Sequence, residues 1–327
     1  MNARIGVRRR ACLLAVAVVA CCGGAVASSS PRPVDGAGGV GVRRQLSDSA
    51  TAPARIGPLV PGQPNDGIWQ SADRWAGTPA PILLTRFHID RSDTRAVAYV
   101  AWMRASRTQL ALYPGLYGPG PTTLPRGPEQ VPLAARSRLL ATFNSGFYEQ
   151  DAAGGFYVNG LLYDPMLRGL ATVVAYRDGR VDVIRWQAGR RPGRRIVMAR
   201  QNLPLFVNDG HPNPILATSK HWGDAPLVWR TGLGIDRRGN LVYLAAPDIA
   251  AVGLARLLVH AGAVRAMELD INLTWPILVT YAGPGASKPS LFVPNPTQIP
   301  GRFLSISTKD FFALYLRTTA STPNQPY

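Results

Sequence analysis

All three cysteines of this 327-residue chain lie within its first 22 residues, at positions 12, 21 and 22. A domain built from the rest of the chain contains no disulfide, no thiolate nucleophile and no cysteine-bound metal. It therefore needs a packed hydrophobic core to be stable. The length is sufficient for such a core, in one large domain or two small ones.

The cysteines belong to an N-terminal segment with the three parts of a secretory signal. Arginines at positions 4, 8, 9 and 10 form a positive region, Ala11–Ala20 is uncharged and mostly apolar, and Ala25–Ala27 is a small-residue cleavage site. We predict that residues 1–27 are a signal peptide. The protein is then secreted or held on the extracytoplasmic cell surface.

A second processing site offers an alternative. Val18–Cys21 resembles a bacterial lipobox, in which Cys21 would carry lipid and tether the protein to the membrane. Residues 28–65 are rich in Ser, Pro, Gly and Ala and have no apolar period, which predicts a flexible tether. The folded domain is expected over residues 66–320, and nothing in the sequence indicates its oligomeric state.

The net charge of +17 comes almost entirely from arginine, since Lys220, Lys288 and Lys309 are the only lysines. This charge suits phosphorylated or anionic glycans, which an exported protein meets outside the cytoplasm. A genome-wide codon bias would produce the same excess of arginine. We expect no specific nucleic-acid partner, because basic and aromatic residues do not interleave and no known nucleic-acid-binding module is present.

The apolar patterning predicts a strand-rich domain. β-Branched and aromatic residues gather in short runs, and Asp178-Gly179 between two of these runs is a hairpin signal. Residues 308–316 fit either a closing helix or an edge strand. The other expected strands of this group are residues 81–89, 96–104, 108–113, 138–143, 171–176 and 180–186.

The last third of the chain adds a helix. Residues 249–261 have apolar side chains at helical spacing, with Asp248 as the expected N-cap and Gly262 as the stop signal. Strands are expected on either side, at 241–246 and 265–272, so these segments form a right-handed βαβ unit. The predicted fold class is therefore α+β, a twisted mixed β-sheet with a few helices and one βαβ unit near the C-terminus.

Polar residues alternate with apolar ones along the segment Arg265–Thr274. Successive side chains of a strand face opposite sides, so the alternation predicts an apolar face and a polar face. Two carboxylates on one face lie roughly 6–7 Å apart at the backbone, which admits the separations of about 5–5.5 Å and about 6.5–9.5 Å that glycosidases use. An ordinary strand with one solvated face has the same pattern. Met267, Leu269 and Ile271 would face the core, whereas Glu268, Asp270 and Asn272 would form the polar row.

Two further segments place polar groups where a ligand could bind. Asn144, Ser145 and Gly146 follow an apolar strand and offer an amide, a hydroxyl and bare backbone, although they also suit an ordinary turn. Arg230 interrupts an apolar strand pattern, and an interior arginine needs an anionic partner. That partner is either a substrate phosphate or one of the two carboxylates of the polar row in a structural salt bridge.

No cofactor is expected from the motifs. The P-loop, the GxSxG elbow and the Rossmann glycine fingerprint are absent. A divalent cation could be held by oxygen atoms of Asp270, Glu268 and Asn272, but these residues do not form a dedicated cage. Metal-binding spacing is also missing among the scattered histidines, which are His88, His211, His221 and His260.

In their order and spacing, these segments resemble the phosphodiester glycosidase family. The family's N-G-G-F-F turn corresponds to residues 144–148, and its R-T-x-x-G-x segment and following G-x-L turn correspond to residues 230–235 and 239–241. Its L-G-A helix end and its strand A-L-N-L-D-G-G-G-S correspond to residues 261–263 and 266–274.

The resemblance covers about residues 85–316 and includes departures from the family pattern. Asp270 and Thr274 keep the positions of the aspartate and the final hydroxyl, but Ile271–Leu273 replaces three glycines. Glycines let a substrate approach the backbone closely, so their loss narrows that approach. Glu268 adds a carboxylate where the family usually has an uncharged residue.

The resemblance implies an exported hydrolase that cleaves a glycosyl phosphodiester or a related bond of a cell-envelope glycan. Asp270 would be the nucleophile or general base, Glu268 its acid partner, and Arg230 the residue that binds the phosphate. The alternative is a non-catalytic envelope glycan-binding protein whose site has decayed. The residues that would bind and orient the substrate are Asn144, Ser145, Gly146, Asn272 and Thr274.

Overall fold

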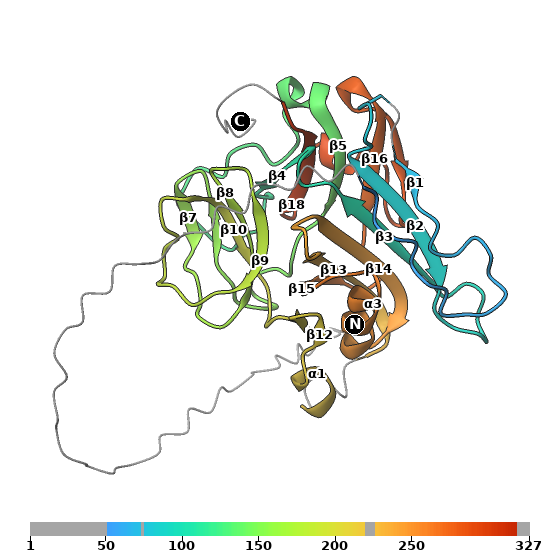
Figure 1. Cartoon of the computed structure of the whole chain (residues 1–327). Helices are drawn as coiled ribbons and strands as arrows, with labels where there is room; N and C mark the ends of the chain where they lie inside the picture. Colours follow the sequence, from blue (N-terminus) through green and yellow to red (C-terminus); the bar gives the residue numbers. More distant parts are fainter. Residues whose placement is uncertain (1–50, 73–74, 220–225, 319–327) are drawn as a thin grey trace, which may run out of the picture. The chain divides into compact units, whose positions relative to one another are not determined.

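The structure is a computed structural model that describes residues 51–72, 75–219 and 226–318 (Figure 1). All of these residues belong to one compact unit, Arg44–Tyr327. The predicted signal peptide, the alternative lipidation site at Cys21 and most of the predicted tether lie outside the described residues. Within the described part, no helix is long and apolar enough to cross a membrane.

Three antiparallel sheets make up the unit, and every strand pair in the described residues is antiparallel. The largest sheet has the strand order β1 (Gln70–Ser71), β2 (Ile82–His88), β3 (Val97–Met103), β14 (Leu241–Ile249), β13 (Val228–Ile235), β15 (Arg265–Ile271), β11 (Val207–Asn208) and β12 (His211–Pro212).

The other two sheets have five strands each. One has the order β7 (Leu161–Asp164), β6 (Phe156–Val158), β10 (Ile196–Gln201), β8 (Ala171–Tyr176) and β9 (Val181–Arg185). The other has the order β17 (Ser287–Leu291), β16 (Leu278–Gly283), β5 (Leu139–Asn144), β18 (Phe311–Leu316) and β4 (Thr108–Tyr113).

Helices are few and short. In the described residues they are α1 (Ile215–Thr218), α3 (Ala251–His260) and the 3-10 turns η1 (Leu133–Arg138), η2 (Pro284–Ala286) and η3 (Arg302–Leu304). The prediction of a strand-rich chain with a few helices is therefore confirmed. The strands form three antiparallel sheets, however, where one mixed sheet was expected.

The main core lies where the three sheets meet. One buried cluster contains Met103 of β3, Leu112 of β4, Phe143 of β5, Val173 of β8 and Leu233 of β13. Since each sheet contributes one face to this cluster, the strands bring distant parts of the sequence together around a common apolar centre.

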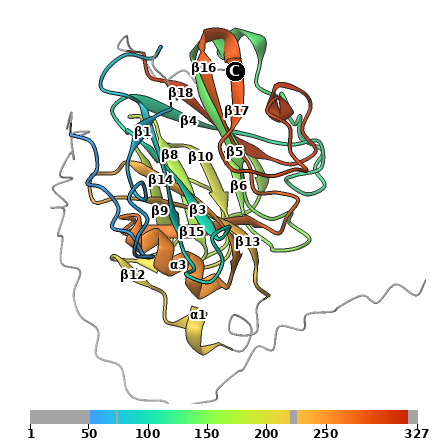
Figure 2. The same ribbon diagram turned by 90° about the vertical axis from the view of Figure 1, so that its right-hand side faces the viewer.

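A second core covers the other face of the largest sheet. Val242 and Leu244 of β14 pack with Leu254 and Leu258 of α3, whereas the intervening Tyr243 faces the main core. Figures 1 and 2 show α3 on the side of the unit away from β16 and β5. The middle strands are thus buried on both faces, which explains their nearly continuous apolar sequences.

The helix α3 differs from its prediction at its N-terminus. Its N-cap is Ala250, without a side-chain cap, and Asp248 lies in β14 with a φ of 46°. The predicted end at Gly262 is confirmed: its φ is 92°, and its N–H donates to the carbonyl of Val259 at 2.9 Å. A residue without Cβ adopts this left-handed conformation at little cost.

The order strand–helix–strand is present in β14, α3 and β15, but these two strands do not pair with each other. Strand β13 lies between them and pairs antiparallel with both. The predicted hairpin around Asp178-Gly179 joins β8 to β9. The segment predicted as a helix or an edge strand is β18, and it lies between β5 and β4 rather than at an edge.

The described part of the predicted tether, residues 51–65, contacts the folded unit. Ile56 is 5% exposed and its N–H donates to the carbonyl of Gly67 at 3.2 Å. The Nε2 atom of His260 at the end of α3 lies 2.8 Å from the carbonyl oxygen of Gly57. This stretch has no regular helix or strand, and its composition is that of a linker. It nevertheless packs against the folded unit.

Candidate active site

A β-bulge interrupts β15 between Glu268 and Ile271, in the stretch that contains Asp270. Along β13, Arg230 pairs with Ile271 and Gly232 pairs with Glu268, so two steps on β13 correspond to three on β15. One extra residue in a strand breaks the alternation of its side chains. Glu268 and Asp270 therefore do not form the expected row on one face, and they have different partners.

Glu268 pairs with Arg230 inside the protein. Nη1 of Arg230 donates to Oε1 of Glu268 at 2.7 Å, and both side chains are almost fully buried. The remaining guanidinium groups donate to the carbonyls of Ile249 and Pro226, at 2.8 and 3.0 Å. Of the partners that the sequence left open for Arg230, the structure therefore shows Glu268.

Burial raises the pKa of Glu268 to about 7, and the adjacent Arg230 opposes that rise. A carboxyl taken out of water is harder to ionise, and a nearby cation stabilises the ionised form. The Oε2 atom of Glu268 has no hydrogen-bond partner among the described residues. This carboxyl group is thus balanced between its two protonation states near neutral pH.

Asp270 pairs with Lys309, which lies two residues before the start of β18. The ammonium of Lys309 contacts Oδ2 of Asp270, and Oδ1 accepts a hydrogen bond from the N–H of Ile271 at 2.9 Å. Both charged side chains are buried. Burial raises the pKa of Asp270 to about 6, and Lys309 limits the rise by its charge and its hydrogen bond.

Two aromatic rings enclose this ion pair. The Nζ atom of Lys309 lies 4.4 Å from the ring centroid of Tyr148 and 4.5 Å from that of Trp275. The two rings meet edge to face, with centroids 5.7 Å apart. An ammonium over aromatic faces is stabilised by their negative quadrupoles, so the rings fix the position of Lys309.

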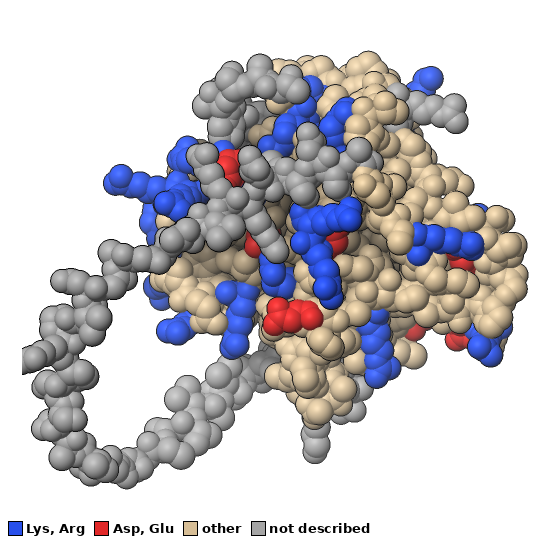
Figure 3. Space-filling view, in the orientation of Figure 1, with Lys and Arg blue, Asp and Glu red and all other residues tan. Residues whose placement is uncertain are grey.

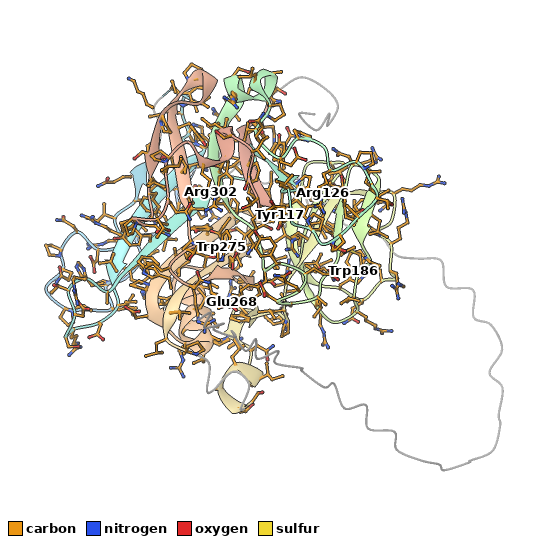
Figure 4. All side chains as sticks on the ribbon, turned by 180° about the vertical axis from the view of Figure 1, so that it is seen from behind. Tyr117, Arg126, Trp186, Glu268, Trp275 and Arg302 are labelled. Carbon is orange, nitrogen blue, oxygen red and sulfur yellow. The ribbon has the colours of Figure 1, made fainter. Side chains whose placement is uncertain are left out.

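A second cation, Arg302, lies beside the same rings. Its guanidinium carbon is 5.3 Å from the ring centroid of Trp275, and its Nη1 donates to Oε1 of Gln298 at 2.5 Å. In the view of Figure 4, Trp275 lies between Arg302 and Glu268. Arg302 is only partly buried. Burial lowers its pKa, and the negative charge of nearby Asp270 opposes that lowering.

Asp310, the next residue along the chain, makes a second buried ion pair. Nε of Arg200 in β10 donates to its Oδ2 at 2.8 Å, and Nη2 of Arg200 donates to the carbonyl of Phe147 at 2.5 Å. The consecutive Lys309 and Asp310 thus bind groups from β15 and β10. Because Lys309 and Asp310 lie just before β18, their two ion pairs link the sheet of β18 to the sheets of β15 and β10.

Asn144 is linked to Asp270 through a buried hydroxyl. Its Nδ2 donates to Oγ1 of Thr231 at 2.8 Å, and Thr231 donates to the carbonyl of Asp270 at 2.6 Å. Oδ1 of Asn144 accepts from the hydroxyl of Tyr243 at 3.0 Å. The structure therefore brings Asn144 and Asp270 into one network, in which the amide of Asn144 supports the backbone of β15.

Ser145 and Gly146 lie against the bulge. The N–H of Asp270 donates to the carbonyl of Ser145 at 3.0 Å, and Nδ2 of Asn202 donates to the carbonyl of Glu268 at 2.9 Å. A Cβ on Gly146 would lie 3.1 Å from the side chain of Asn202. The buried Ser145 Oγ and Asn202 Oδ1 have no hydrogen-bond partner among the described residues.

Asn272 and Thr274 are exposed in the loop between β15 and β16, after the strand has ended at Ile271. Oδ1 of Asn272 accepts from the N–H of Thr274 at 2.8 Å, which closes a local turn. Asp270, Glu268 and Asn272 are therefore not arranged as a shared cation cage. No group of three His, Cys, Asp or Glu side chains able to hold a metal ion is found in the described ranges.

Sequence reasoning missed Lys309, Trp275 and Arg302, and named Tyr148 only as part of a turn. The composition contained one signal for Lys309: it is one of three lysines in a chain with 36 Lys and Arg residues. No local pattern connected it with Asp270, because 39 residues separate them.

Comparison with known proteins supports the resemblance on which these assignments drew. Residues 137–270 match the phosphodiester glycosidase family. No curated protein matches the chain. This family match includes the segments of Asn144 and Arg230 and ends at Asp270.

Three solved structures are similar to the chain. The catalytic domain of zebrafish N-acetylglucosamine-1-phosphodiester alpha-N-acetylglucosaminidase, auto-inhibited by its pro-peptide, has 14% identity and a TM-score of 0.48, covering 77% of this chain and 88% of that one. A hypothetical protein from Synechocystis has 13% identity and a TM-score of 0.41, covering 72% and 62%. A putative exported protein from Burkholderia pseudomallei has 12% identity and a TM-score of 0.39, covering 74% and 75%. The family match itself confirms the predicted resemblance to the phosphodiester glycosidase family over residues 137–270.

Proposed function

We propose that this protein is an exported hydrolase that cleaves a glycosyl phosphodiester, or a related phosphorylated bond of a cell-envelope glycan, at a site centred on Asp270. The observation that carries the proposal is the buried ion pair of Asp270 with Lys309, enclosed by Tyr148 and Trp275. It lies at the end of the segment that matches the phosphodiester glycosidase family.

The chemistry of this bond suits the groups around Asp270. Hydrolysis adds the hydroxyl of water to the sugar C1, and the phosphate departs with the former glycosidic oxygen as a phosphomonoester. The second pKa of such a phosphate is about 6, so it leaves at neutral pH without a strong acid. The departing anion instead needs positive charge, which Arg302 and Lys309 supply beside the aromatic rings.

In this proposal Asp270 acts as the nucleophile or general base. Either role requires the ionised carboxylate, and a pKa of about 6 leaves it mostly ionised at pH 7. Asn144 and Ser145 hold its backbone through Thr231 and a direct hydrogen bond. The carboxylate thus has a fixed position before the substrate arrives, which lowers the cost of reaching the transition state.

The roles expected of Arg230 and Glu268 change in this proposal. Because the guanidinium of Arg230 is bound by Glu268 and two carbonyls, phosphate binding passes to Arg302 and Lys309. Arg230 and Glu268 instead join β13 to β15 next to the bulge. Asn272 and Thr274, on the loop that carries Trp275, remain the proposed contacts to the sugar.

The proposed location outside the cytoplasm rests on the predicted signal peptide, and lipidation of Cys21 remains the alternative anchor. The substrate is then a phosphorylated or anionic glycan. The positive charge of the protein suits such a partner, and Lys and Arg side chains are spread over the face drawn in Figure 3 with fewer Asp and Glu among them.

A non-catalytic glycan-binding role is the second candidate. It is favoured by the replacement of three glycines with Ile271–Leu273 after the aspartate and by the nearly complete burial of Asp270. In that case the aromatic rings and cations would bind an envelope glycan without cleaving it.

The deciding experiment measures hydrolysis of the methyl diester of N-acetylglucosamine 1-phosphate. Asp270→Asn should reduce kcat/KM about a thousandfold or more, since it removes the reacting group with little change of shape. Arg302→Met should also lose most activity. The matched controls are Asp178→Asn and Arg185→Met, which change exposed residues of the β8–β9 hairpin.

Full activity of a folded Asp270→Asn variant would refute the proposed site. Retention of an envelope glycan by the wild-type protein, with no product after long incubation, would favour the binding role.

A further inference from the structure

Exposed apolar side chains gather around the proposed site. Eleven large hydrophobic side chains in the described ranges are strongly exposed, and five of them are on three loops beside the Asp270–Lys309 pair. Single exposed apolar residues are common, whereas a group of them marks a binding surface. These five, the apolar rim, are Leu116 (43% exposed), Tyr117 (64%), Leu273 (51%), Ile299 (66%) and Ile306 (64%).

Backbone hydrogen bonds bring one part of the rim together. The N–H of Leu116 donates to the carbonyl of Ser307 at 2.8 Å, and that of Tyr117 donates to the carbonyl of Thr308 at 2.9 Å. Ile306 precedes these two acceptors in the chain, and Lys309 follows them. The first part of the rim is therefore anchored next to the lysine of the ion pair.

Side-chain hydrogen bonds bring the other part together. Nδ2 of Asn295 donates to the carbonyl of Leu273 at 2.8 Å, and Gln298 bonds to both Thr274 and Arg302. The N–H of Arg302 donates to the carbonyl of Ile299 at 3.1 Å. The loops that carry Leu273 and Ile299 are thus held next to the Trp275–Arg302 pair.

Trp275 connects the two parts, because its ring contacts both Lys309 and Arg302. Figure 4 labels Tyr117, Trp275 and Arg302, of which Trp275 and Arg302 are in contact. An exposed apolar border therefore lies beside the partly exposed Arg302 and the buried Lys309. A ligand that matches it carries an anionic group next to a hydrocarbon chain.

We infer that the substrate of this site is amphiphilic: a glycosyl phosphodiester whose second alcohol is a long hydrocarbon chain. The phosphate lies at Arg302 and Lys309, and the chain lies along the apolar rim. This inference rests on the proposed function and adds the substrate class to it. Short polar alcohols leave the five rim side chains in water, whereas a chain covers them and gains binding energy with each methylene buried.

The test compares two diesters of N-acetylglucosamine 1-phosphate, with methanol and with dodecanol, below the micelle concentration of the latter. The wild-type protein should have a kcat/KM at least tenfold higher for the dodecyl diester. The triple variant Leu273→Ser/Ile299→Ser/Ile306→Ser should lose this preference and keep its rate on the methyl diester. Ile215→Ser, on the exposed surface of α1, is the control and should keep the preference.

Equal rates of the wild-type protein on both diesters would overturn the inference and leave the proposed function standing. An unchanged preference in the triple variant would overturn it as well. If neither diester is hydrolysed, the proposed function fails, and binding of dodecyl phosphate tests the surface by itself. Binding that the triple variant loses supports an amphiphile at the rim, and equal binding by both proteins excludes it.

Binding of the wild-type protein to phosphatidylcholine vesicles without substrate would assign the rim to membrane docking and overturn the inference.

Discussion

Removal of Lys309 should change the protonation of Asp270 more than any other single substitution. Burial raises the pKa of Asp270, and Lys309 lowers it through its charge and its hydrogen bond, which leaves a pKa of about 6. An adjacent opposite charge lowers the pKa of a carboxyl by about 1–3 units. In Lys309→Met this contribution is lost, so the pKa of Asp270 should rise to about 7–9.

The consequence for activity follows from the ionised fraction of Asp270. With a pKa of about 6, roughly 90% of the carboxyl is ionised at pH 7, and with a pKa of about 8 only roughly 10% is. Lys309→Met should therefore lose about tenfold of its kcat/KM at pH 7 from protonation alone, and recover that part at pH 9. The acidic limb of its pH profile should move upward by at least one unit.

Two measurements check this prediction. The pH dependence of kcat/KM gives the position of the limb in the free enzyme. Carbon NMR of protein labelled in its aspartate carboxyls gives the pKa of Asp270 without reference to activity. Lys288→Met is the matched control, since Lys288 is exposed in β17 and should leave both values unchanged. An unchanged pKa of Asp270 in folded Lys309→Met would refute the ion pair as the cause.

Three further outcomes are expected. The raised pKa of Asp270 means that the folded protein holds this proton more tightly than the unfolded chain does. The proton's contribution to stability is therefore present below about pH 4 and lost as the pH rises through about 6. The fall in unfolding free energy between pH 4 and pH 7 should be smaller in Asp270→Asn than in the wild type, and an equal fall would contradict this. Arg230→Met leaves Glu268 buried without its partner and should lower the free energy of unfolding, measured in urea at pH 9, by about 3–5 kcal/mol. The loss should be smaller at pH 5, where Glu268 is protonated, and adding Glu268→Leu should restore much of it. Gly146→Ala should cost about 1–3 kcal/mol because its Cβ crowds Asn202, while Gly189→Ala, with open space around it, should have little effect on thermal unfolding.

Features that depend on neighbouring residues could be predicted from the sequence. The β8–β9 hairpin follows from Asp178-Gly179 between two β-rich runs, and the end of α3 follows from Gly262. Each is determined by a backbone preference of one or two residues. The resemblance of their segments to one family also placed Asn144 and Asp270 at a common site, and the structure links the two residues in one network.

Features that depend on pairing between distant strands could not be predicted from the sequence. The bulge in β15 exists only relative to β13, so alternation within Arg265–Ile271 wrongly predicted a single polar face. Asp248 has the composition of an N-cap, but β14 continues through it and the helix begins later. Lys309 reaches Asp270 only because β18, which follows it in the chain, lies between β5 and β4 in the five-stranded sheet that contains these strands.

The bulge in β15 has a consequence for how such chains evolve. One residue more or less between Glu268 and Asp270 would exchange the face on which the aspartate lies, without any change of the aspartate itself. An insertion or deletion could therefore move a carboxylate from a structural ion pair into a reactive setting in one event. An alignment that places such strands without a gap would then equate carboxylates from opposite sides of the sheet. Identical residues in that alignment would have different chemical roles.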